Sequence, residues 1–214
     1  MTKISLKRSL ALFSCIFLFW SFYRYFPEFL PTWFEELVFK PAFWLLPTFW
    51  LVLNLEKQPL SSLGFTSKNK SKVFYWSFGF GIIFFVEGFL TNILKYRGLQ
   101  ISFPSLSSAV NVFFLSLMTA FTEETLFRGY FFTRFSRLWH HELWANLASS
   151  FLFALIHLPM GVFVLSYVPA MLLIYFFLVF IFAFASAFIF ARTQNLFSSI
   201  LLHLFWSWPI MLFK

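Results

Sequence analysis

Long apolar runs separated by short polar segments dominate the pattern of this chain. A helix that crosses a bilayer needs about 20 mostly apolar residues, and seven runs approach or reach that length. The second run is the least regular, because Glu35, Glu36, Lys40 and two prolines interrupt it, and residues 161–169 are a candidate for re-entry into the membrane. The pattern predicts an all-α, polytopic transmembrane helix bundle of about seven helices, or eight. The expected spans are residues 8–26, 35–54, 73–94, 106–131, 144–160, 168–191 and 197–213.

Composition agrees with this pattern. The 214 residues are 60% hydrophobic and 11% charged, whereas ordinary soluble domains are about 25% charged. A soluble domain of this size could not bury so much apolar surface, so its main solvent must be lipid. No hydrophilic segment is long enough to fold alone, which makes residues 1–214 a single integral membrane domain.

The basic residues predict the orientation of the chain, because cytoplasmic loops of membrane proteins are enriched in Lys and Arg. With a cytoplasmic N-terminus, the inner segments carry a clear excess of these residues. This bias explains the net charge of +8 without nucleic acid as a partner. There is no glycine-rich nucleotide loop, and Gly79 and Gly81 are expected to mark helix packing. The inner segments hold Lys3, Lys7, Arg8, Lys57, Lys68, Lys70, Lys72, Arg128, Arg134, Arg137 and Arg192, and the outer segments hold Arg24, Lys95, Arg97 and Lys214.

Two adjacent carboxylates inside an apolar run are the strongest candidates for chemistry, because ionisable groups in a bilayer are costly and mark functional sites. Residues 121–130 contain Glu123 and Glu124, followed by Arg128. Arg128 lies four residues after Glu124, so the two share a helix face and can pair, whereas Glu123 projects about 100° away. This spacing predicts that Arg128 neutralises Glu124 and leaves Glu123 available as a base. The alternative is a buried ion pair that only fixes helix packing.

Two histidines in later apolar runs, His157 and His203, strengthen the catalytic interpretation. At a rise of 1.5 Å per residue, Glu123 and His203 lie about 16 Å, and His157 about 20 Å, from the inner surface. We therefore expect the three side chains at a similar depth, as a polar site in a helix bundle requires. Ser207 lies one turn after His203, where its hydroxyl could help stabilise an oxyanion, although a helix-packing role fits the sequence equally well.

The residue types exclude or disfavour other protease classes. The chain has no Asp, which excludes an aspartyl intramembrane protease. The zinc motif His-Glu-x-x-His is not completed after His141 and Glu142, because residue 145 is Ala145. No Gly-x-Ser motif near a helix start supports rhomboid-type serine chemistry. A zinc site made of one glutamate and two histidines stays a physical alternative, since these are adequate ligands.

The candidate residues resemble the CAAX-protease and bacteriocin-processing family of glutamic-type intramembrane endopeptidases, also called Abi proteins. The resemblance rests on three motifs in order, each in its own predicted helix, and covers about residues 106–210. Each motif alone is weak, but three in this order are fairly specific. The motifs are Glu-Glu-x-x-x-Arg at 123–128, Phe-x-x-x-His at 153–157, and a late histidine with a polar residue four positions on, at 203–207.

The resemblance implies a role for each matched residue. Glu123 and His157 would activate a water, and His203 would help to form the oxyanion hole. Glu124 and Arg128 would support the site, with no metal or other cofactor. The family usually carries Asn or Asp where this chain has Ser207, and serine lacks the amide donor.

We therefore expect an intramembrane endopeptidase that cleaves membrane-associated peptides or proteins, in the bacterial inner membrane with a cytoplasmic N-terminus. Its site is expected in a water-filled cavity that opens toward the inner leaflet. Two alternatives stay open. One is a catalytically weak or inactive family member that acts as a membrane binding or peptide-resistance protein, supported by Ser207. The other is a proton-coupled transporter with Glu123, Glu124 and His157 as a relay, although the small size and lack of repeats count against it.

Overall fold

The structure, a computed structural model, describes residues 5–26, 30–96 and 105–212. Every element in the described residues is helical, and several helices contain π-helical or 3₁₀ turns, labelled η. In chain order the elements are α1 (Leu6–Tyr25), α2 (Thr32–Phe34), η1 (Glu35–Phe39), α3 (Lys40–Trp50), η2 (Leu51–Leu55), η3 (Leu60–Leu63), α4 (Lys70–Tyr96), α5 (Leu106–Glu124), η4 (Thr125–Phe132), α6 (Thr133–Trp139), α7 (Glu142–Pro159), η5 (Met160–Val164), α8 (Pro169–Thr193) and α9 (Leu196–Leu212).

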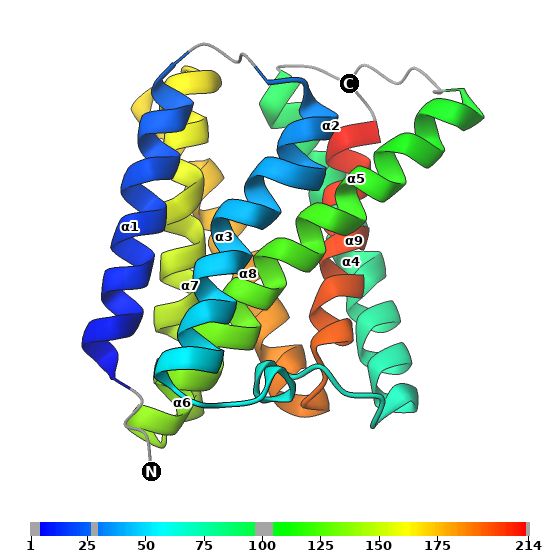
Figure 1. The fold of residues 1–214 in the computed structure, drawn as a ribbon. Helices are drawn as coiled ribbons and strands as arrows, with labels where there is room; N and C mark the ends of the chain where they lie inside the picture. Colours follow the sequence, from blue (N-terminus) through cyan, green and yellow to red (C-terminus); the bar gives the residue numbers. More distant parts are fainter. Residues whose placement is uncertain (1–4, 27–29, 97–104, 213–214) are drawn as a thin grey trace.

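These elements join into seven helical rods that alternate in direction along the described chain (Figure 1). Six of the rods are long and apolar enough to cross a membrane, and the seventh, Leu196–Leu212, is a shorter apolar helix. The prediction of an all-α polytopic bundle with about seven helices is confirmed. The fourth rod continues to Trp139, beyond the predicted end at residue 131, because η4 and α6 extend it without a break.

The expectation of a re-entrant segment at residues 161–169 is wrong. Residues Met160–Val164 form a π-helical turn that completes the rod of α7, and α8 begins at Pro169 after a short connection. Pro159 lacks the N–H group that an α-helix would use at this point, and the helix widens directly after it. The apolar stretch therefore extends a spanning helix and does not make a separate entry into the membrane.

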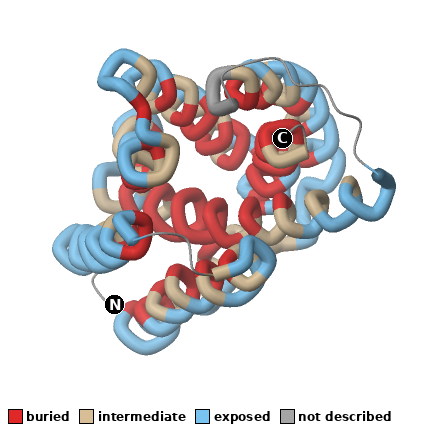
Figure 2. The backbone as a smooth tube through the Cα atoms, turned by 90° about the horizontal axis from the view of Figure 1, so that it is seen from above, coloured by how far each residue is buried: buried red, intermediate tan, exposed pale blue. Residues whose placement is uncertain are grey.

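The bundle buries ionisable side chains in its interior and exposes many large apolar side chains on its outer surface, as expected for a protein in lipid. Figure 2 shows buried segments in the centre and exposed segments around the periphery. Large apolar side chains such as Phe74, Ile83 and Phe177 are exposed on the outer surface. Glu123 and Glu124, in contrast, are buried. Ionisable groups buried in this way must pair with one another.

Helices α4 and α9 approach each other closely through two glycines. A Cβ atom on Gly88 would lie 2.2 Å from the carbonyl oxygen of Trp206, and one on Gly81 would lie 2.6 Å from the ring of Phe205. A Cβ atom on Gly79 would meet nothing within 4 Å. The predicted packing role is thus confirmed for Gly81 and wrong for Gly79, and Gly88 makes the closest contact of the three. This contact sets the position of Trp206 and of its neighbours in α9.

Candidate active site

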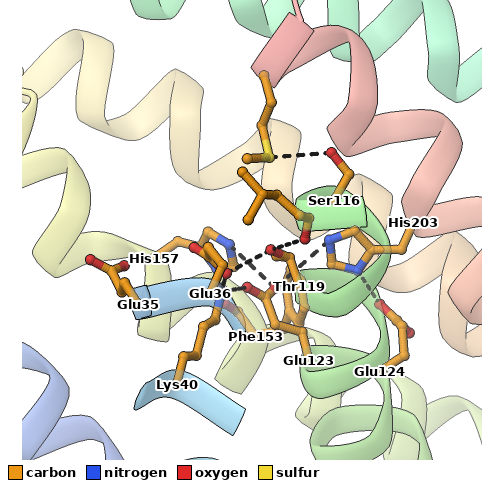
Figure 3. A network of polar contacts seen from close by, with 12 residues as sticks. Glu35, Glu36, Lys40, Ser116, Thr119, Glu123, Glu124, Phe153, His157 and His203 are labelled. Carbon is orange, nitrogen blue, oxygen red and sulfur yellow. Dashed lines mark hydrogen bonds and ion pairs between the residues drawn. The ribbon is translucent and has the colours of Figure 1, made fainter. Parts of the chain in front are cut away.

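The three predicted catalytic side chains meet in the middle of the bundle, where α5, α7 and α9 face the start of α3 (Figure 3). Glu123 is the penultimate residue of α5, His157 lies near the end of α7, and His203 lies in α9. The Nε2 atoms of His157 and His203 each lie 3.8 Å from Oε2 of Glu123. The structure therefore brings together the three residues that the depth argument placed at one level. Their catalytic roles stay predictions.

Lys40 completes this group and was not predicted to belong to it. Its Nζ atom lies 2.6 Å from Oε1 of Glu123 and 3.1 Å from Oε2 of Glu36. The hydroxyl of Thr119 donates a hydrogen bond of 2.6 Å to the same oxygen of Glu36. Glu123 thus has a cation of its own, Lys40, which the spacing of Glu123, Glu124 and Arg128 did not predict. A buried carboxylate needs such a partner to offset its desolvation.

The pairing with Lys40 leaves one oxygen of Glu123 available. Oε2 of Glu123 has no hydrogen-bond partner among the described residues, and it is the oxygen that faces both histidines. A role for Lys40 in an ion pair was partly predictable from the sequence, because a lysine in an apolar run must pair with a carboxylate. It did not identify which one, because Lys40 and Glu123 are 83 positions apart.

Glu124 holds the ring of His203. Its Oε2 lies 3.0 Å from Nε of Arg128, which confirms the ion pair predicted from their spacing, and accepts a hydrogen bond from Ser186 at 2.7 Å. Its Oε1 lies 2.7 Å from Nδ1 of His203. A carboxylate only accepts hydrogen bonds, so Nδ1 of His203 carries a proton. Nε2 of the same ring can therefore donate only when the ring is an imidazolium.

A backbone hydrogen bond at Nδ1 of His157 fixes which ring nitrogen carries the proton, and the other nitrogen, Nε2, faces Glu123. Its Nδ1 lies 2.8 Å from the carbonyl oxygen of Phe153, one turn earlier in α7. Because a carbonyl oxygen only accepts, Nδ1 carries the proton and Nε2 of the neutral ring keeps its lone pair. The side chain of His157 is 16% exposed, against 5% for Glu123 and 1% for His203. His157 is thus the most accessible of the three.

A cavity of about 140 Å³ lies beside these groups. Its lining includes Glu123, His157, His203 and Ser207, together with several tryptophans and methionines. A volume of this size holds several water molecules. The hydroxyl of Ser207 is buried and has no hydrogen-bond partner among the described residues, so its hydrogen-bonding capacity is not taken up by the protein.

Three phenylalanines close the cavity toward the end of the bundle where α1 begins. Phe127, Phe153 and Phe182, called the aromatic floor below, are each 0% exposed. The ring centroid of Phe153 lies 4.9 Å from that of Phe127 and 5.8 Å from that of Phe182, and His203 lies 4.9 Å from Phe182. None of the three lines the cavity. The packing of these rings therefore gives no support to the expected opening toward the inner leaflet, which stays a prediction.

The part of the chain that the structure describes contains no cluster of metal-ligand residues. No group of three or more His, Cys, Asp or Glu side chains there is arranged to hold a metal ion. The carboxylates of the site are instead held by cations, Glu123 by Lys40 and Glu124 by Arg128.

Comparison with known proteins agrees with the motifs. Residues 105–209 match the family model described as Type II CAAX prenyl endopeptidase Rce1-like. This region contains Glu123, His157, His203 and Ser207 but not Lys40, which precedes it. Neither the curated proteins nor the solved structures gave a match. Residues 105–209, the part of the chain that carries the three motifs, thus match a model of the CAAX-protease family that those motifs predicted.

Proposed function

We propose that this protein is an intramembrane endopeptidase that hydrolyses peptide bonds in membrane-associated peptides or proteins, with Glu123 as the general base. One observation carries the proposal. The unpartnered oxygen of Glu123 lies 3.8 Å from Nε2 of both His157 and His203, at the edge of a cavity. This distance is too long for a direct hydrogen bond, and a water that contacts both groups fits the arrangement. The match to a protease-family model supports the same reaction class.

The proposed reaction begins with a water bound between Oε2 of Glu123 and Nε2 of His157. Glu123 takes a proton from this water while the oxygen of the water attacks the carbonyl carbon of the peptide bond. The resulting oxyanion accepts hydrogen bonds from the His203 imidazolium and from the hydroxyl of Ser207. The C–N bond then breaks, and the proton held by Glu123 passes to the leaving amine. Peptide and water thus become a carboxylic acid and an amine.

Lys40 contributes to the electrostatics of this step. While Glu123 is ionised, its charge offsets that of the Lys40 ammonium 2.6 Å away. When Glu123 accepts a proton, the positive charge of Lys40 loses this partner at the moment when negative charge develops on the substrate oxygen. A fixed cation that gains influence in the transition state lowers the barrier to the reaction.

The decisive test compares intact protein with Glu123→Gln, which keeps the shape of the side chain but removes the base. Glu87→Gln is the matched control, because Glu87 lies within α4, is partly buried, bonds to Thr91 and does not line the cavity. The termini of membrane proteins are compared by mass spectrometry in cells with equal amounts of each variant. We expect specific termini with the intact protein and with Glu87→Gln, and a loss of about 10²–10⁴ in rate with Glu123→Gln.

Identical termini in all three cell lines would refute catalysis by Glu123. The protein would then act as a binding or peptide-resistance protein, the second candidate function. One observation favours that alternative, which is the serine at position 207 where the family usually carries Asn or Asp. Because the experiment reads out every cleaved membrane protein, a positive result also identifies the substrate.

We further infer that the chain lies in a bacterial cytoplasmic membrane with its N-terminus in the cytoplasm. The six long apolar helices make it an integral membrane protein. The excess of Lys and Arg at the end of the bundle where α1 begins supports the orientation. Lys3, Arg97 and Lys214, which belong to the same count, lie outside the described residues.

A further inference from the structure

The two ends of the helix bundle differ in charge. One end, at the bottom of Figure 1, holds the start of α1, the start of α4, helix α6 and the end of α8. At the opposite end the cation whose side chain the structure describes is Arg24, which pairs with Glu35. The end that is rich in Lys and Arg stays in the cytoplasm, so the bottom of the bundle faces that compartment. The described cations at this cationic end are Lys7, Arg8, Lys57, Lys68, Lys70, Lys72, Arg134, Arg137 and Arg192.

The cavity lies on the other side of Glu123 from this cationic end. Helix α9 lines it from His203 to Met211, and the rod of α7 lines it from Ile156 to Met160. Both helices begin at the cationic end, so these segments are their distal parts. Helix α8 begins at the opposite end and lines the cavity with Tyr175, near its start. Three of the helices that line the cavity thus do so with the segments that lie between the site and the extracytoplasmic end.

Access from the cytoplasm is closed by the aromatic floor. Phe127, Phe153 and Phe182 are packed without exposure on the cytoplasmic side of His203, and Arg128 lies 4.5 Å from the ring centroid of Phe153. A polypeptide that arrived from the cytoplasm would have to displace these rings and separate the buried pair of Arg128 and Glu124. A polypeptide that arrives from the extracytoplasmic side meets the cavity first.

The outer part of the cavity suits an apolar segment. Met160, Met211 and Tyr175 line it together with Trp206. Methionine side chains are flexible and polarisable, so they adapt to apolar groups of different shape. The Lys and Arg side chains that line the cavity, Arg24 and Lys40, are already held by carboxylates, Arg24 by Glu35 and Lys40 by Glu36 and Glu123.

We propose that the active site is reached from the extracytoplasmic half of the bilayer. Its substrates are then membrane-anchored or exported polypeptides that present an extended apolar segment on that side. The cleavage of these substrates rests on the proposed function, whereas the direction of access does not. A segment that is exposed only in the cytoplasm is excluded by the aromatic floor and the cation distribution together.

Cysteine accessibility tests the direction of access without requiring catalysis. Cys15 is the single cysteine, so Cys15→Ser gives a background free of thiols. Met211→Cys places a thiol in the cavity and keeps a sulfur beside Ser116, which lies 3.3 Å from the present sulfur atom. Ser107→Cys marks the extracytoplasmic end and Ser67→Cys the cationic end, and both serines are exposed. Sealed cells are treated with a charged, membrane-impermeant maleimide, before or after permeabilisation.

We expect the reagent to modify Ser107→Cys and Met211→Cys in sealed cells, and Ser67→Cys only after permeabilisation. Met160→Cys, on the opposite wall of the cavity, should behave like Met211→Cys and serves if that variant does not accumulate. The inference is overturned if the cavity cysteines react only after permeabilisation, if they stay unmodified while Ser107→Cys reacts, or if Ser67→Cys reacts in sealed cells. Loss of cleavage in Glu123→Gln is measured separately, so a failed direction of access and a failed catalytic function give different results.

Discussion

At the scale of single residues, the site is a set of buried charges in which each carboxylate has a cation. Lys40 holds Glu123, and Arg128 holds Glu124. A charge buried without a partner is strongly destabilising, so these pairs are a condition for folding. The pair of Lys40 and Glu123 also decides which carboxylate oxygen faces the histidines, because Lys40 binds only Oε1 of Glu123. Oε2 of Glu123 is the atom that remains for a water.

The role of Lys40 can be tested by changing its charge and its length. Lys40→Met should lower kcat by roughly 10²-fold with little change in KM, because Glu123 loses the contact that fixes its orientation. Lys40→Arg keeps the positive charge and should recover part of this loss. The measurement is steady-state cleavage of a substrate found by the terminus comparison, together with thermal unfolding of each variant in detergent.

A double variant separates positioning from a general structural effect. If Lys40 acts through Glu123, then Lys40→Met should cause no further loss in the Glu123→Gln background, since the two residues act as one unit. Independent losses that add in the double variant, or full kcat in Lys40→Met alone, would contradict the positioning role.

At the scale of elements, departures from regular α-helix cluster around the site. The π-helical turn η1 directly precedes Lys40, η4 directly follows Glu124, and η5 begins three residues after His157. Wider turns of this kind are rare and occur often at functional sites, because they shift the face on which a side chain projects. Three of the rods thus carry their ionisable site residues at or beside an irregular turn. The fourth rod that contributes to the site, α9 with His203, is positioned by its close contact with α4.

Gly88 offers a test of that helix contact. Gly88→Ala should lower the free energy of unfolding by about 1–3 kcal/mol, the typical cost of overpacking, because its Cβ atom would lie 2.2 Å from the carbonyl oxygen of Trp206. Gly79→Ala is the matched control on the same helix, since nothing lies within 4 Å of a Cβ atom there. Chemical unfolding in mixed micelles measures both variants, and equal stability for the two would show that the contact relaxes without cost.

At the scale of the whole molecule, another buried ion pair lies at the end of the bundle where α1 begins. Arg134 in α6 lies 2.8 Å from Glu56, which precedes η3, and its guanidinium also donates to Ser62 at 3.0 Å. Neither charged side chain is more than 1% exposed. This network joins the connection between α3 and α4 to the end of the rod that carries Glu123. It therefore holds these two segments together on the side of the site where the aromatic floor lies.

Removing one partner of this pair should be costly. Glu56→Ala leaves Arg134 buried without its carboxylate and should lower the free energy of unfolding by about 3–5 kcal/mol. Glu142→Ala is the control, because its ion pair with Arg192 is 43% exposed on each side chain and such pairs contribute about 0–1 kcal/mol. Both variants are compared by chemical unfolding in micelles. Similar losses for the two would show that burial does not strengthen the Glu56 contact.

The sequence by itself determined the features that depend on local spacing. The seven helical rods follow from apolar runs, because lipid accepts only segments whose backbone groups are satisfied internally. The pair of Glu124 and Arg128 follows from four-residue spacing on one helix. The three motifs predicted the family, and the comparison with its model agreed. The common depth of Glu123, His157 and His203 was also accessible, since helical rise converts position into height.

Only the tertiary structure decided which helix faces meet. Lys40 pairs with Glu123 across 83 positions, and Glu124 reaches His203 across 79, distances over which no spacing rule applies. The partner of Glu123 and the position of the cavity relative to the site were beyond sequence reasoning for the same reason. Both depend on the rotation of each helix about its own axis, which is set by the packing of all seven rods together. Sequence periodicity fixes the height of a group along a helix, whereas packing fixes the direction in which it points.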